Sequence, residues 1–120
     1  MVQVKNLPPG HGISYGSEYV TSTQETVAVI AVGYGDGFRR THGNEVLLHG
    51  QPAPVRGRVC MDQIVVGVGH IPTVHIGDEV VLVGRQGTAH LSAETVARRW
   101  GTINYEVTCG IGARVPRICL

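Results

Sequence analysis

Apolar residues occur in short runs along this chain, and glycine or proline ends most of the runs. Runs that alternate or are rich in β-branched residues predict strands over residues 2–7, 26–32, 45–48, 55–59, 62–66 and 79–83. Between the third and fourth runs, Gln51-Pro52-Ala53-Pro54 indicates a turn. With 17 glycines and 6 prolines, the pattern predicts an all-β (mainly) fold: a small Greek-key or barrel-like β domain with one or two short helices.

One segment has the period of a helix instead. Ser92 is a favourable N-cap, because its hydroxyl can accept a hydrogen bond from a backbone N–H of the first turn. The apolar residues that follow fall on one face: Ala93, Val96, Ala97 and Trp100. Gly101 can adopt the left-handed conformation that ends a helix. We therefore expect a helix between Ser92 and Gly101.

The next segment is ambiguous. Alternate residues from 103 to 111 are apolar or aromatic, which is typical of a strand. Ile103, Val107 and Ile111 also fit one face of a helix, at steps of four. The pattern alone leaves both alternatives open.

Length and charge narrow the class of protein. A chain of 120 residues predicts one domain, residues 1–120. A net charge of +1 and scattered arginines give no reason to expect nucleic acid or an acidic membrane as a partner. No apolar run is long enough to cross a bilayer or to form a secretory signal.

Cysteine and histidine usage adds two expectations. Three cysteines without a C-x-x-C pair argue against a disulfide framework, so we expect reduced thiols and a cytoplasmic location. The 6 histidines have no metal-ligand spacing, so we expect no metal site.

Several residues could carry chemistry, and each also has a structural interpretation. Tyr15 lies among small residues after a Pro-Pro-Gly turn, where it could present its hydroxyl or only pack its ring. A tyrosine that serves as a base needs nearby positive charge to lose its proton. The loop from Gly33 to Gly37 carries Tyr34 and Asp36, polar groups on a flexible mount of the kind that often binds ligands. Taken by itself, the loop is better interpreted as a glycine-rich turn after a strand.

The segment from Arg56 to Gln63 is denser in polar groups. An arginine here could hold a carboxylate through two hydrogen bonds, or the segment could be an edge strand with exposed charges. Cys60 has no evident partner base and is interpreted as a small packed residue. Lys5, the only lysine, lies in an alternating run and is expected to face solvent.

Taken in order, these segments resemble one family. The series comprises Ile13-Ser14-Tyr15-Gly16, Gly33-Tyr34-Gly35-Asp36-Gly37, Gly57-Arg58-Val59-Cys60-Met61-Asp62-Gln63, Gly101-Thr102-Ile103-Asn104-Tyr105-Glu106-Val107 and Arg114-Val115-Pro116-Arg117. It resembles the alanine racemase C-terminal domain over nearly the whole chain. In that family a barrel domain binds pyridoxal phosphate through a lysine, and the β domain of a second subunit completes the site.

The resemblance implies a function in the full-length protein and a role for seven residues. The function is that of a homodimeric, pyridoxal-phosphate-dependent isomerase that interconverts L- and D-alanine for cell-wall synthesis. Tyr15 matches the acid/base on the L-alanine face, Met61 the residue whose backbone N–H holds the substrate carboxylate, and Tyr105 a ligand of the cofactor phosphate. The remaining matches belong to the substrate corridor: Tyr34, Arg40, Arg58 and Asp62. The resemblance also favours a short helix near Tyr105.

A (β/α)8 barrel needs about 200 residues or more, which this chain cannot contain. We therefore expect the chain alone to be inactive and to bind no pyridoxal phosphate. Two alternatives stay open: a stand-alone binding or dimerisation module without catalytic activity, and the same domain from a racemase of another amino acid such as serine.

Overall fold

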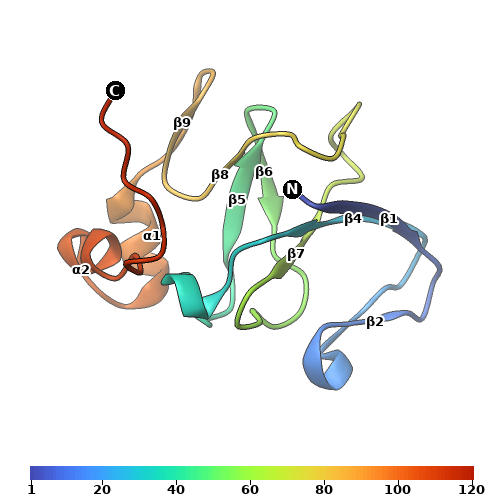
Figure 1. Cartoon of the computed structure of the whole chain (residues 1–120). Coiled ribbons are helices and arrows are strands. Elements are labelled where there is room, and N and C mark those ends of the chain that lie inside the picture. Colours follow the sequence, from blue (N-terminus) through green and yellow to red (C-terminus); the bar gives the residue numbers. More distant parts are fainter.

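The computed structural model describes residues 1–120 and confirms a mainly β domain with two short α-helices (Figure 1). The strands are β1 (Gln3–Leu7), β2 (Gly12–Ile13), β3 (Tyr19–Val20), β4 (Glu25–Ile30), β5 (Glu45–Leu48), β6 (Gln51–Pro54), β7 (Ile64–Gly67), β8 (Val80–Val81), β9 (Gly84–Gln86) and β10 (Ala89–Leu91). Two antiparallel three-stranded sheets, with orders β1-β4-β7 and β6-β5-β8, form the body of the domain. Two hairpins, β2-β3 and β9-β10, complete the set.

The structure corrects the expected turn at residues 51–54. These residues form β6, which pairs with β5, and the turn lies at His49 and Gly50, which both have positive φ. Because β6 is an edge of its sheet, Pro52 and Pro54 can lack a donor without breaking the ladder. The strand expected over the following residues, 55–59, is also wrong. Of these residues only Val55 forms a bridge, to Val66. Residues 79–83 likewise form only the short β8 before β9 begins.

Helix α1 (Ala93–Trp100) confirms the signals at both of its ends. The Ser92 hydroxyl accepts a hydrogen bond from Thr95 N at 3.1 Å, and Gly101 ends the helix at φ 70°. The inner face buries Val96, Ala97 and Trp100, and the Trp100 ring meets Phe38 edge-on at 5.8 Å. The indole N–H of Trp100 donates to buried Asn44, so this large residue has a polar partner in the core.

The ambiguous segment is a helix. Helix α2 (Asn104–Cys109) follows directly on α1, and Val107 is its buried residue. In a strand, Ile103, Tyr105 and Val107 would share one face, but Ile103 and Tyr105 are 61% and 73% exposed. The helix expected from the family resemblance is therefore confirmed, against the alternating pattern.

The core has two parts of very different size. Seventeen buried residues from both three-stranded sheets and both helices form the main cluster. Leu7, Ile13 and Val27 form a small second cluster beneath the β2-β3 hairpin. In Figure 1 this hairpin and the two helices lie at opposite ends of the molecule, with the sheets between them.

Candidate functional site

Tyr15 begins the short 3-10 helix η1 (Tyr15–Ser17) at the tip of the β2-β3 hairpin. The turn is tight, because Ser14, Gly16 and Ser17 all have positive φ. Ser14, at φ 66° and ψ −172°, occupies a region otherwise used almost only by glycine, at a cost of about 1–3 kcal/mol. The turn leaves Tyr15 68% exposed, and its hydroxyl has no hydrogen-bond partner in the chain. Such strain often accompanies a functional residue.

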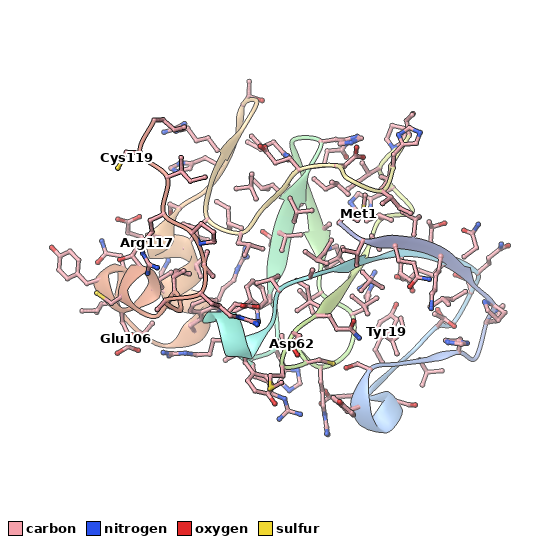
Figure 2. The ribbon with its side chains drawn as sticks, viewed as in Figure 1. Met1, Tyr19, Asp62, Glu106, Arg117 and Cys119 are labelled. Carbon is pink, nitrogen blue, oxygen red and sulfur yellow. The ribbon has the colours of Figure 1, made fainter.

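Side-chain contacts fix this hairpin against the rest of the domain. The Ser14 hydroxyl donates to Arg58 O at 2.7 Å and lies 3.3 Å from Cys60 Sγ. At the base, Tyr19 donates to Glu25 at 2.7 Å, a bond that is the main cause of the raised pKa of Tyr19. Figure 2 labels Tyr19 where its ring lies between the hairpin and the β1-β4-β7 sheet. The contacts from Ser14 bring Tyr15 next to the segment that contains Met61.

The Met61 segment is joined to a second short 3-10 helix, η2 (Tyr34–Asp36). Tyr34 N donates to Cys60 O at 3.0 Å, and Gly35 N donates to Met61 O at 2.9 Å. The two segments are so close that a Cβ atom on Gly33 would overlap the carbonyl oxygen of Cys60, so only glycine fits there. Tyr34 itself is 50% exposed beside this contact.

The backbone N–H of Met61 has no hydrogen-bond partner in the chain. It belongs to the same trans peptide as the carbonyl of Cys60. Because N–H and C=O point in opposite directions across a trans peptide, the bond from Tyr34 to Cys60 directs the Met61 N–H away from η2. A free, oriented backbone donor of this kind can bind a carboxylate oxygen.

Tyr15 and Met61 line one open depression of about 530 Å³. Its other lining residues are Ser14, Cys60, Asp62 and Gln63. Figure 2 labels Asp62 between η2 and the hairpin, at one edge of the domain. The structure thus brings together two residues that are 46 positions apart in the sequence.

The two predicted corridor arginines lie next to a second, polar depression of about 280 Å³. Arg40 Nε donates to Val59 O at 3.2 Å, and Arg58 Nε donates to Glu18 at 3.1 Å. Glu18 also lies 3.7 Å from the imidazole of His42. The arginines are therefore held by the backbone and by one carboxylate, with part of each guanidinium left to meet a ligand or partner.

Tyr105 does not join this group. It lies on α2, at the other end of the molecule from η1 (Figure 1). Its hydroxyl has no hydrogen-bond partner, so an exposed donor is available there as well. The adjacent Glu106 accepts from Arg39 at 2.6 Å, which is the main cause of the lowered pKa of Glu106.

The structure also assigns two residues that sequence reasoning placed differently or missed. Asp36, noted in the sequence as a polar group on a loop that could bind a ligand, is buried and accepts a hydrogen bond from Gly33 N at 3.0 Å. Its other oxygen lies 2.6 Å from the guanidinium of Arg114, which also reaches Asp62 at 3.1 Å. These two carboxylates raise the pKa of Arg114, with Asp36 the larger cause. Arg114 stood in a recognised motif, but nothing in the sequence pattern gave its partners.

Beyond these residues, the chain has few groups that could hold a cofactor or a metal ion. Lys5 is exposed on β1, opposite Val27, as expected for a solvent-facing lysine. No group of three His, Cys, Asp or Glu side chains lies close enough together to hold a metal ion. All three cysteines are free. Neither helix has the length and apolar character needed to cross a membrane.

Comparisons with known proteins agree on one family. The family model described as "Alanine racemase, C-terminal domain" matches residues 1–119. An alanine racemase of Halothermothrix orenii is 54% identical over 119 residues, which are 98% of this chain and 31% of that protein. An alanine racemase of Desulfovibrio desulfuricans is 49% identical over 120 residues, or 98% of this chain and 32% of that protein. The chain thus spans about a third of the length of the curated relatives it matches.

A solved structure shows the same fold. The alanine racemase of Bacillus anthracis with bound L-Ala-P superposes with a TM-score of 0.92 at 46% identity, covering 98% of this chain and 30% of that one. At this identity and coverage the likeness extends to sequence and fold together. The chain therefore belongs to the alanine racemase C-terminal domain family.

Proposed function

We propose that this chain is the C-terminal domain of a pyridoxal-phosphate-dependent alanine racemase that interconverts L- and D-alanine, supplying D-alanine for peptidoglycan synthesis. In this proposal Tyr15 is an acid/base that the domain delivers to the active site of a partner subunit. One observation carries the proposal: the hydroxyl of Tyr15 and the backbone N–H of Met61 are both without partners and belong to one depression. A backbone N–H that can donate to the substrate carboxylate, next to a group that can transfer a proton, is what an amino-acid racemase requires.

The chemistry divides between two faces of the substrate. Racemisation removes a proton from one face of Cα and returns one to the opposite face, so a group is needed on each side. Tyr15 transfers the proton on one of these faces. Its turn is strained at Ser14 and is held by the hydrogen bond from Ser14 to Arg58. Met61 N–H orients the substrate through its carboxylate, while Tyr34, Arg40, Arg58 and Asp62 line the approach.

The residues present fit the cofactor only in part. When bound, pyridoxal phosphate takes up the negative charge that develops on Cα. The exposed, unpartnered hydroxyl of Tyr105 is a suitable donor to a phosphate oxygen. Lys5, the only lysine, is exposed on the edge strand β1, so in this proposal the lysine that holds the cofactor comes from the barrel domain. We accordingly expect the 120-residue chain mixed with pyridoxal phosphate to leave the spectrum of the free aldehyde unchanged.

The separation of Tyr15 from Tyr105 supports a shared active site. The two residues lie at opposite ends of one domain, so one copy cannot easily place both beside the same cofactor. A homodimer removes the difficulty, because Tyr105 of one copy and Tyr15 of the other can meet at one site.

Three free thiols are compatible with the reducing cytoplasm, where we place the enzyme.

Subunit mixing in the full-length protein tests this arrangement. One variant carries Tyr15→Phe, and the other lacks the cofactor-binding lysine of the barrel. If sites are shared between subunits, a mixed dimer has one doubly defective site and one intact site, so activity should recover on mixing. If each subunit builds its own site, mixing should restore nothing.

Assays with L-alanine and L-serine on the wild type decide the substrate, and no racemisation of either would favour the stand-alone module.

A further inference from the structure

The carboxylate of Asp36 is buried and caps the first turn of η2. It is 8% exposed as a residue, and its Oδ2 accepts from the backbone N–H of Gly33 at 3.0 Å. Gly33 O in turn accepts from Asp36 N and Phe38 N. The conformation of η2 therefore depends on a buried carboxylate whose other oxygen needs a partner.

Arg114 is that partner, and it reaches two segments at once. Its guanidinium lies 2.6 Å from Asp36 Oδ1 and 3.1 Å from Oδ1 of Asp62, the residue that follows Met61. The segment that carries Arg114 is seated on η2, since Gly112 N donates to Asp36 O at 2.9 Å. Gly37 also lies against Gly110 so closely that a Cβ atom would not fit.

The bridge spans the same two segments that the backbone joins. Tyr34 N and Gly35 N donate to the carbonyls of Cys60 and Met61, and these bonds set the direction of the Met61 N–H. Arg114 adds a third tie between η2 and this loop, through side chains instead of backbone. An isolated surface ion pair contributes little, but this one ends on a carboxylate that is 11% exposed and holds a backbone turn.

We propose that Arg114 is a positioning residue for the substrate carboxylate: by bridging Asp36 and Asp62, it holds the Cys60–Met61 peptide so that the Met61 N–H faces the depression shared with Tyr15. The inference rests on the function proposed above. The polar partners of the Arg114 side chain are Asp36 and Asp62, not Tyr15, and Arg114 has no part in proton transfer, so its loss weakens carboxylate binding more than it slows the chemical step.

The test uses the full-length, cofactor-loaded protein that carries this domain. Arg114→Gln removes the charge, Arg114→Lys keeps it, and Arg85→Gln is the control because Arg85 is exposed and has no ion-pair partner. Three quantities are measured for each: kcat and KM for L-alanine, the Kd of propionate by calorimetry, and the Tm. Propionate is alanine without its amino group, so its Kd reports carboxylate binding without turnover.

Arg114→Gln should raise KM and the propionate Kd about tenfold, the factor expected for one misaligned hydrogen bond to a charged group, while kcat falls less than threefold. Arg114→Lys should recover part of the loss, because an ammonium can pair with one carboxylate but not bridge two in plane. Arg85→Gln should match the wild type. If Arg114→Gln does not fold, the Lys variant decides, with KM and Kd raised at least threefold.

Unchanged KM and propionate Kd, or a fall in kcat as large as the rise in KM, would overturn the role given to Arg114. A full-length wild-type protein that racemises neither L-alanine nor L-serine would contradict the proposed function itself. An active wild type with an unaffected Arg114→Gln variant overturns only the present inference.

Discussion

The hydroxyl of Tyr19 donates a hydrogen bond to Glu25 at 2.7 Å, and this bond ties the hairpin that carries Tyr15 to the β1-β4-β7 sheet. Arg56 completes the contact, since its Nε also donates to Glu25 at 2.7 Å and its guanidinium lies 4.9 Å from the centre of the Tyr19 ring. The apolar cluster beneath the hairpin is small and consists of Leu7, Ile13 and Val27. The position of Tyr15 therefore depends on polar contacts as much as on apolar packing.

Removing the Tyr19 hydroxyl should loosen the hairpin. We expect Tyr19→Phe to lower the free energy of unfolding by about 1 kcal/mol, the net value of one hydrogen bond. Urea unfolding of the 120-residue chain measures the loss. Tyr105→Phe is the matched control, because it removes a tyrosine hydroxyl that has no partner, and it should leave the unfolding free energy unchanged. Equal losses in the two variants would contradict the role given to Tyr19.

The isolated chain should fold cooperatively and then self-associate. The 17-residue cluster gives the domain a core of its own, whereas Tyr15, Tyr34 and Met61 are each at least half exposed on one side. Exposed apolar groups gathered in one region favour association. Thermal unfolding followed by circular dichroism should show one transition, and sedimentation velocity should show mass rising with concentration. A strictly monomeric, folded species at high concentration would refute the second half of this prediction.

How far the sequence predicts this fold depends on whether the signals are local. The helix after Ser92 was predicted correctly because the cap, the apolar face and the glycine stop all lie within ten residues. The strand β6 was missed because its two prolines are turn formers by local statistics. They are tolerated only because β6 is an edge, which is a property of the assembled sheet.

The candidate site shows the same division. Family resemblance selected Tyr15 and Met61, and the structure brings them to one depression. The bridge from Asp36 to Arg114 could not be predicted, because its two residues are 78 positions apart and lie in two separate motifs, neither of which indicates the other as its partner. Tyr105 was grouped with Tyr15 by function, and only the fold revealed that they lie at opposite ends of the domain.

Acid should weaken the contact between α2 and the main domain. The hydrogen bond from Arg39 is the main cause of the lowered pKa of Glu106. A carboxyl whose folded pKa is lowered adds stability that is present above its unfolded pKa, near 4.3, and is lost as the pH falls through the folded value. Arg39→Gln should thus destabilise the chain more at pH 7 than at pH 2.5. Unfolding free energies at several pH values test this.

Arg98→Gln is the control for that experiment, because the hydrogen-bond partner of the Arg98 side chain is the hydroxyl of Thr95, which does not titrate. Its effect on the unfolding free energy should change little between the two pH values. Arg39 also donates to Trp100 O at 3.2 Å, so part of the Arg39→Gln effect should persist in acid. A difference between wild type and Arg39→Gln that does not vary with pH would remove Glu106 from the explanation.

Tyr15 should act on one face of the substrate only. In the full-length protein, Tyr15→Phe keeps the ring and removes the oxygen that transfers the proton, so the fold and the cofactor absorbance should be retained. General acid–base catalysis contributes about 10²–10⁴-fold, and we expect racemisation to slow by a factor in that range. Both directions should slow, because each turnover uses both faces.

Exchange of the α-proton in heavy water distinguishes proton transfer on one face of Cα from proton transfer on the other. The group opposite Tyr15 remains, so solvent deuterium should enter D-alanine without inversion, whereas exchange from L-alanine should be as slow as racemisation. Equal exchange from both enantiomers at the wild-type rate would exclude Tyr15 from proton transfer and leave its strained, exposed turn without a catalytic explanation.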